Sequence, residues 1–210
     1  PAPSPASAGE RGWGSRLALA LGLLALAVSP VAGQVATPYP LPDVPDPALC
    51  DIAPVGEPAL NGAIESADIA TPEIFRNGVV PEGRPASPEQ AAVVYGMVRR
   101  LVACYSAGEL LRAYALFTPG YLNRVFGKQG GYTDAAYDSL ATPQPAESGK
   151  RVKILDIDNI RMLDDGRVAA TVILEYAVIP MPKRFLMVFA DDGEEWKIDD
   201  ILGEISFSVP

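Results

Sequence analysis

Two aspartates and three tyrosines have the side chains best suited to chemistry in this sequence: Asp158, Asp200, Tyr95, Tyr105 and Tyr176. A carboxyl group in an apolar pocket loses hydration, and this raises its pKa toward the range useful for acid or base catalysis. A tyrosine hydroxyl can donate a hydrogen bond to the carbonyl group of a ligand. The more ordinary roles are a solvated acid, and a core tyrosine with its hydroxyl at the edge. No residue is therefore assigned as catalytic.

Residues 151–209 must position most of these groups, because only this part of the chain shows sustained alternation of apolar and polar residues. Asp192-Gly193 predicts a two-residue turn in the second of two hairpins. With this turn, the apolar residues on one face are Phe185, Met187, Phe189, Trp196 and Ile198. Asp200 falls opposite Phe185 on that face, so Asp200 and Trp196 are predicted to line a pocket.

The facing of the first hairpin stays open. Its turn lies in the sequence DDG at residues 164–166. A two-residue loop would turn Asn159 and Arg161 inward, whereas a three-residue loop closed by a glycine bulge would turn Asp156 and Asp158 inward. A bulge within the long strand would change the facing part of the way along it.

Helices are predicted before the strands. Ser87-Pro88-Glu89-Gln90 has the form of a capping box that opens a helix, and Gly108 ends that helix. Shorter helices are expected over residues 109–117, 120–126 and 133–140. Thr118-Pro119 caps the second of these, and Gly127 ends it.

The first residues have the features of a secretory signal peptide. Arg11 and Arg16 precede an apolar run at residues 17–28, and small residues follow at 31–33. This pattern predicts a signal peptide over residues 1–33 with cleavage before Gln34, and an uncleaved N-terminal anchor is the alternative. The chain is therefore expected to be exported to an extracellular, cell-surface or periplasmic location.

Residues 34–86 are rich in proline, which removes amide donors and fixes φ. We predict a largely extended leader here, outside a folded domain at residues 87–210. A short helix at 59–68 or 72–77 is the most regular structure expected in the leader.

Cysteine content and charge narrow the function further. A lone pair of cysteines in an oxidising compartment is expected to bond, so a Cys50–Cys104 disulfide is predicted, with two buried thiols as the alternative. The chain has no His, which argues against a metal site and against histidine-based catalysis. A formal net charge of −9 without a basic stripe argues against nucleic-acid binding. No cofactor is expected.

The order of these elements resembles that of the nuclear transport factor 2-like superfamily, in particular its SnoaL-like and ketosteroid-isomerase-like members. Three segments carry the resemblance: CYSAGELLRAYALFTPGYLNR at 104–124, LDDGRV at 163–168 and DGEEWKID at 192–199. The resemblance implies an α+β, cystatin-like cone in which a curved antiparallel sheet wraps around N-terminal helices and encloses a pocket. It also implies a homodimer through the outer face of the sheet.

Two functions are compatible with this fold, because fold alone does not define activity. The first is an exported, non-enzymatic domain that binds a small apolar ligand or another protein, with membrane contact only through an uncleaved signal segment. The alternative is an isomerase, dehydratase or polyketide-cyclase-like enzyme, which needs at least two polar groups converging in the pocket, such as an inward Asp and Tyr. The missing catalytic residues favour the first function.

Overall fold

The computed structural model describes residues 40–65, 82–127, 134–179 and 181–203. The chain separates into two units, Pro1–Gln34 and Val35–Pro210, and the described residues all belong to the second. The predicted signal peptide lies outside the described residues, as does part of the predicted leader. In the described parts of the chain, no helix is both long and apolar enough to cross a membrane.

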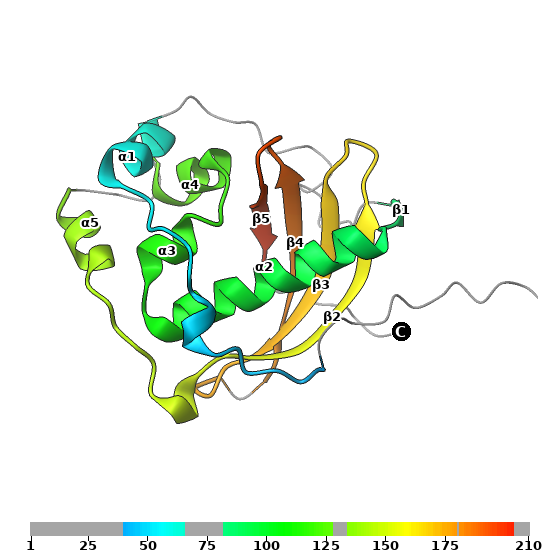
Figure 1. The fold of residues 1–210 in the computed structure, drawn as a ribbon, viewed down its shortest axis with the longest axis horizontal. Helices are drawn as coiled ribbons and strands as arrows, with labels where there is room; N and C mark the ends of the chain where they lie inside the picture. The colour runs from blue at the N-terminus through cyan, green and yellow to red at the C-terminus, as the bar shows by residue number, and fades with distance from the viewer. Residues whose placement is uncertain (1–39, 66–81, 128–133, 180, 204–210) are drawn as a thin grey trace, which may run out of the picture. The chain divides into compact units, whose positions relative to one another are not determined.

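A five-stranded antiparallel sheet forms the centre of this unit, with the strands in sequence order (Figure 1). The strands are β1 Arg84–Pro85, β2 Lys153–Met162, β3 Val168–Glu175, β4 Lys183–Asp191 and β5 Trp196–Leu202. The free edge of β5 is partly paired by the chain before α4, since the amide of Thr118 donates to the Ile198 carbonyl at 2.9 Å. The sheet and helices together confirm the predicted α+β class.

Helices cover one face of the sheet. They are α1 Glu57–Glu65, α2 Pro88–Ala107, α3 Leu110–Tyr114, α4 Pro119–Phe126 and α5 Asp134–Ala141, with short 3-10 turns at Pro47–Leu49 and Ser148–Lys150. The long helix α2 crosses the sheet, and the other helices gather toward its β5 side (Figure 1). The predicted capping box of α2 is present, and Gly108 ends the helix with φ 70°, a conformation that favours glycine. Thr118 caps α4 as predicted.

The prediction of an extended leader is wrong for residues 40–65. Leu60 of α1 is fully buried in the main hydrophobic core. The predicted Cys50–Cys104 disulfide is formed, and Asp43 accepts a hydrogen bond from Arg99 of α2 at 2.6 Å. Proline excludes long regular elements but does not prevent burial, so this segment packs on the domain as short helices joined by extended chain.

The first hairpin has the three-residue loop, but bulges decide to which face of the sheet each side chain of β2 points. The amide of Leu163 donates to the carbonyl of Arg167 at 2.7 Å, which closes the loop around residues 164–166. Register shifts lie between Asp158 and Arg161 and between Ile154 and Asp156. Ile157 then pairs with Val172, and Asp158 pairs with Thr171. Neither unbulged alternative from the sequence holds along the whole strand.

The second hairpin differs from its prediction in two ways. Asp191 pairs with Trp196, so four residues form the loop instead of two. This shift of two residues leaves Phe189 paired with Ile198 on the predicted face. A bulge at Asp199 then changes the register, and Asp200 pairs with Val188 instead of lying opposite Phe185. The next residue, Ile201, pairs with Met187.

Candidate functional site

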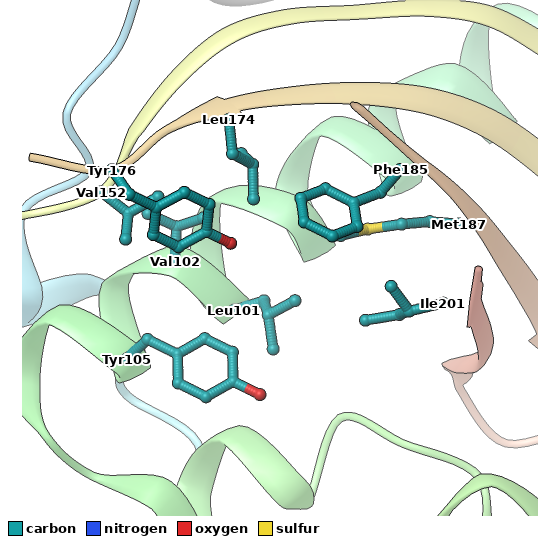
Figure 2. Close-up of a pocket in the computed structure, with 9 residues that line it drawn as sticks. All are labelled: Leu101, Val102, Tyr105, Val152, Leu174, Tyr176, Phe185, Met187 and Ile201. Atoms are coloured by element: carbon teal, nitrogen blue, oxygen red, sulfur yellow. The ribbon is translucent and has the colours of Figure 1, made fainter. Parts of the chain in front are cut away.

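An apolar cavity of about 320 Å³ lies between the C-terminal part of α2 and the sheet (Figure 2). Its lining residues are Leu101, Val102, Tyr105, Val152, Leu174, Tyr176, Phe185, Met187 and Ile201. No carboxylate or basic side chain is among them. A partly open space of this size and character suits a small, mostly apolar molecule.

Helical and strand periodicity together build the walls. Leu101 and Tyr105 are four residues apart on α2, so both lie on one side of the helix. From the sheet, Phe185 and Met187 alternate along β4 and point to the same face. Ile201 joins that face because the bulge at Asp199 has changed the register of β5.

Two tyrosine hydroxyls supply the polar side-chain atoms of the lining. Figure 2 shows the hydroxyls of Tyr105 and Tyr176 directed into the space that the lining residues enclose. Within the described parts of the chain, neither hydroxyl makes a hydrogen bond to another protein group. Elsewhere the Tyr95 hydroxyl donates to the Ile157 carbonyl at 2.9 Å. The two cavity hydroxyls therefore have hydrogen-bonding capacity left for a ligand.

Both cavity tyrosines stay protonated at neutral pH. Desolvation is the largest cause that raises the pKa of Tyr105, and the nearby hydroxyls of Tyr114, Tyr121 and Tyr176 raise it further. Desolvation also raises the pKa of Tyr176. Tyr105 is 39% exposed because it borders the cavity, but the surrounding protein still limits its hydration. Each hydroxyl is thus a neutral donor and not an anionic base.

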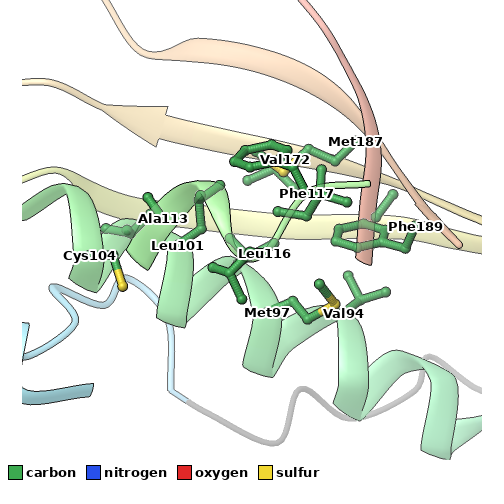
Figure 3. Close-up of a cluster of buried hydrophobic side chains, with 14 of the residues drawn as sticks. Val94, Met97, Leu101, Cys104, Ala113, Leu116, Phe117, Val172, Met187 and Phe189 are labelled. Atoms are coloured by element: carbon green, nitrogen blue, oxygen red, sulfur yellow. The ribbon is translucent and has the colours of Figure 1, made fainter. Parts of the chain in front are cut away.

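The other end of the space between α2 and the sheet is filled. Phe189 is fully buried there against α2 (Figure 3), and Phe117 stacks on Tyr121 of α4 with ring centroids 4.5 Å apart. We call this region the filled half; its buried side chains are Val94, Met97, Phe117, Val168, Phe189 and Ile198. Close packing of this kind gives a defined position to the elements that continue into the cavity wall.

The structure brings two of the predicted site residues together. Tyr105 and Tyr176 both line the cavity. Tyr95 does not, since it is only 2% exposed and its hydroxyl is bonded to the backbone of β2. Trp196 packs against the hydrophobic core and is also absent from the lining.

Asp158 lies away from the cavity. Its strand partner is Thr171, whereas the neighbouring Ile157 joins the main core. Desolvation raises the pKa of Asp158, followed by the nearby Asp156, while Thr171 and Arg184 oppose the rise. The raised pKa thus belongs to a carboxyl on the other face of the sheet, outside the pocket predicted for it.

Asp200 is buried, and its carboxyl group interacts with other groups of the protein. It is 7% exposed, and one carboxyl oxygen lies 3.5 Å from an Arg124 guanidinium nitrogen of α4. The other accepts from the amide of Ile201 at 2.9 Å. Desolvation raises its pKa, and Arg124 and the Ile201 amide counteract that rise. The expectation that Asp200 faces the pocket with Phe185 is wrong, because the bulge removes it from that register.

The site contains residues that sequence reasoning missed. Leu101, Val102, Val152, Leu174 and Ile201 complete the wall, although none was singled out as a ligand contact. A signal for Ile201 existed, because Ile198 and Ile201 are three residues apart. Regular strands repeat every two residues, so a spacing of three between buried apolar residues indicates a bulge.

The described residues contain no group of three or more His, Cys, Asp or Glu side chains arranged to hold a metal ion. Comparison with known proteins finds no matching family model, no matching curated protein and no matching solved structure. The fold and site therefore define this chain as an α+β domain with an apolar, tyrosine-bearing cavity.

Proposed function

We propose that this chain is an exported, non-enzymatic domain that binds a small, neutral and largely apolar molecule in the cavity beside α2. The observation that carries this proposal is the pair of unpartnered hydroxyls, Tyr105 and Tyr176, in an otherwise apolar wall. Hydroxyls without a protein partner can donate to a ligand acceptor, and the apolar wall around them would strengthen such a hydrogen bond.

The cavity specifies the class of ligand. An apolar cavity of about 150 Å³ already accepts a molecule the size of benzene. At about 320 Å³ this cavity has room for a larger molecule of one or two rings or a short branched chain. Because the described lining residues include no charged group, a carbonyl, ether or hydroxyl oxygen is the expected polar feature of the ligand, placed to accept from Tyr105 or Tyr176.

The enzymatic alternative has less support. It requires an acid or base converging with a tyrosine on the reacting atoms. Asp158 lies on the other face of the sheet, and Asp200 is held by Arg124 and the Ile201 amide. Two neutral hydroxyls can orient a carbonyl group, but they do not supply a base near neutral pH.

Export and family membership are part of the same proposal. The Cys50–Cys104 disulfide is compatible with an oxidising compartment, in agreement with the signal pattern of residues 1–33. The order of helices and antiparallel strands is compatible with a nuclear transport factor 2-like cone. A homodimer through the outer face of the sheet remains a proposal drawn from that resemblance.

Native mass spectrometry of the chain purified from its own host tests the proposal directly. We expect a co-purified mass whose amount falls when Val152→Phe narrows the cavity. Fluorescence of 6-propionyl-2-(dimethylamino)naphthalene, a neutral two-ring probe with a carbonyl group, should rise on binding and fall with the same variant. Probe binding that is unchanged by Val152→Phe, together with no added mass, would contradict a ligand cavity.

Paired tyrosine variants test the role of the hydroxyls. Tyr105→Phe and Tyr176→Phe should each weaken binding of the co-purified ligand by about tenfold, the loss of one hydrogen bond to the ligand. Tyr95→Phe is the matched control, because its hydroxyl bonds to Ile157 and not to the cavity. Equal effects of all three substitutions would show that tyrosine hydroxyls affect binding only through the fold.

A further inference from the structure

Helices α3 and α4 bring two more tyrosines close to the cavity. Tyr114 is the last residue of α3, and Tyr121 lies in the first turn of α4. Neither is among the lining residues, but both hydroxyls lie close enough to that of Tyr105 to raise its pKa, after desolvation as the largest cause. The hydroxyl of Tyr176 acts on Tyr105 in the same way. Tyr105, which points into the cavity (Figure 2), is therefore the centre of a group of four hydroxyls. We call Tyr105, Tyr114, Tyr121 and Tyr176 the tyrosine cluster.

Ring contacts hold the two added tyrosines in place. Tyr121 stacks on Phe117 with ring centroids 4.5 Å apart, and the Arg124 guanidinium lies over the Tyr121 ring, 5.8 Å from its centroid. Tyr114 meets Phe126 edge to face, with ring centroids 5.0 Å apart. Aromatic pairs in these geometries are favourable. The rings are thus held by packing and not by their hydroxyls.

The hydroxyls of the tyrosine cluster are unused within the protein. In the parts of the chain that the structure describes, none of the four hydrogen-bonds to another protein group. The buried side-chain atoms without a partner there are Ser106 Oγ and Arg151 Nε, and no tyrosine oxygen is among them. Each hydroxyl therefore borders open space. Hydroxyls that lie near one another without bonding leave room for a group that bridges them.

The number of donors sets the polar group of the ligand. Tyr114 and Tyr121 are neutral donors at neutral pH, since desolvation raises the pKa of both. One ligand oxygen can accept from two hydroxyls, so four hydroxyls are matched by two oxygen atoms. Near Tyr121, the carboxylate of Asp200 raises the pKa of the phenol by more than Arg124 lowers it. This negative field disfavours a carboxylate ligand and favours neutral oxygens.

We propose that Tyr114 and Tyr121 are specificity residues of the cavity, and that its ligand is a ring compound with two neighbouring neutral oxygen atoms, such as a vicinal diol or a hydroxy ketone. The apolar wall, which includes Leu101, Phe185 and Met187, receives the ring, and the tyrosine cluster binds the two oxygens. A ligand hydroxyl both donates and accepts, as each tyrosine hydroxyl does, so both sides can be satisfied together. This specificity rests on the proposed binding function and adds the oxygen pattern that the cavity selects.

Three compounds with one ring system test the oxygen pattern. Naphthalene, 2-naphthol and naphthalene-2,3-diol differ only in having no hydroxyl, one hydroxyl or two neighbouring hydroxyls. Equilibrium dialysis measures the affinity of the full chain for each. We expect naphthalene-2,3-diol to bind about tenfold more tightly than 2-naphthol, because the second oxygen adds hydrogen bonds to the tyrosine cluster. Equal affinities for the diol and for 2-naphthol would overturn the proposal.

Tyrosine variants test whether the added hydroxyls act. Tyr114→Phe and Tyr121→Phe keep the rings and should each weaken binding of naphthalene-2,3-diol by about five- to tenfold. Binding of naphthalene, which has no oxygen, should stay the same in both variants. Tyr137→Phe is the matched control, because the Tyr137 hydroxyl of α5 donates to the Val55 carbonyl at 3.4 Å. An equal loss for naphthalene and for the diol, or no loss for either, would contradict a role of these hydroxyls in specificity.

Failure of the oxygen specificity can be told apart from failure of the proposed function. If naphthalene and the fluorescent probe bind and Val152→Phe weakens both, the cavity function holds. Equal binding of the three compounds would then remove only the role of Tyr114 and Tyr121. If neither the probe nor any of the three compounds binds, the cavity function fails, and the specificity fails with it.

Discussion

The two ends of the space between α2 and the sheet are built from the same elements and yet differ in packing. At one end, Phe189 and Phe117 fill the space in the filled half. At the other end, Phe185 and Met187 of the same strand β4 border a cavity of about 320 Å³. Close packing at one end fixes the positions of α2 and β4. These shared elements can therefore border a cavity at the other end without moving.

Bulges keep the open end apolar. In β5, the bulge at Asp199 brings Ile201 to the cavity in the register where plain alternation would put Asp200. In β2, two register shifts place Ile154 and Ile157 in the core, while Asp158 pairs with Thr171. Strand irregularities thus decide the chemistry of the cavity as much as residue types do.

Truncation in the filled half should have the largest effect. Phe189→Ala removes a fully buried ring from close packing, and we expect a loss of about 3–5 kcal/mol in the free energy of unfolding. Phe185→Ala is the matched change at the cavity and should cost no more than about 2 kcal/mol, because that ring already borders open space. Urea denaturation of both variants measures the difference, and equal costs would contradict the contrast between the two ends.

Removal of the disulfide should have the next largest effect. Cys104 adjoins Tyr105 at the hollow end of α2, and its bond to Cys50 closes a separation of 54 residues. Cys50→Ala with Cys104→Ala should lower stability by about 2–4 kcal/mol. Denaturation with and without reductant provides the same test on the unaltered chain. A thiol assay confirms that reduction is complete. If the reduced and oxidised chains are then equally stable, packing alone holds this end of α2.

A larger side chain should give a smaller difference in stability between the two ends. Val168→Phe, next to Phe189, overfills the close-packed region and should cost about 1–3 kcal/mol. Val152→Phe adds the same atoms beside the cavity and should change stability by less than about 1 kcal/mol, while it blocks probe binding. Thermal unfolding in the absence of probe compares the pair. A larger cost for Val152→Phe would mean that the cavity wall does not tolerate a larger side chain.

High pH should cause the smallest of these losses of stability. The pKa of Tyr105 is raised from its ordinary value of 10.0, so the folded chain keeps a proton that the unfolded chain releases. The stability that depends on this proton is complete below pH 10, and it is lost as pH rises from there toward the raised value. Tyr105→Phe should therefore make the loss of stability above pH 10 shallower. Tyrosinate absorbance in the folded chain that reaches its full value by pH 10 would contradict this account.

Local signals in the sequence predicted the helices well. The capping box at Ser87, the stop at Gly108 and the cap at Thr118 all stand where they were expected. Each depends on contacts within a few residues, so the sequence contains the information directly. The disulfide was also predictable, because the chain has only two cysteines and a pattern typical of export.

Facing along the strands was harder to predict, and so was the site. Alternation placed Phe185 and Met187 on one face with Ile198, which the pairing of β4 and β5 bears out. Beyond Ile198 the prediction failed, since a bulge depends on contacts with neighbouring strands and not on the strand alone. The triple spacing of Ile154, Ile157 and Ile160 is the same signal in β2, and it is visible in the sequence.

The role of residues 40–65 could not be derived from proline content. Proline limits helices and strands, but burial of Leu60 depends on a surface that other parts of the chain provide. Long-range packing of this kind leaves little trace in local composition.

The extra residue of β5 has a consequence for how the domain tolerates changes in length. The carboxylate of Asp199 accepts from the Thr118 hydroxyl at 3.0 Å and from Arg167 at 2.9 Å, and its carbonyl accepts from Arg124. A deletion of this residue would leave Ile201 opposite Met187, because the bulge is the only register change between them and Ile198. The inner surface would survive such a deletion, but the hairpin tip and α4 would lose their common anchor. One inserted residue of β5 thus links two distant segments of the chain, α4 with its cap and the tip of the first hairpin.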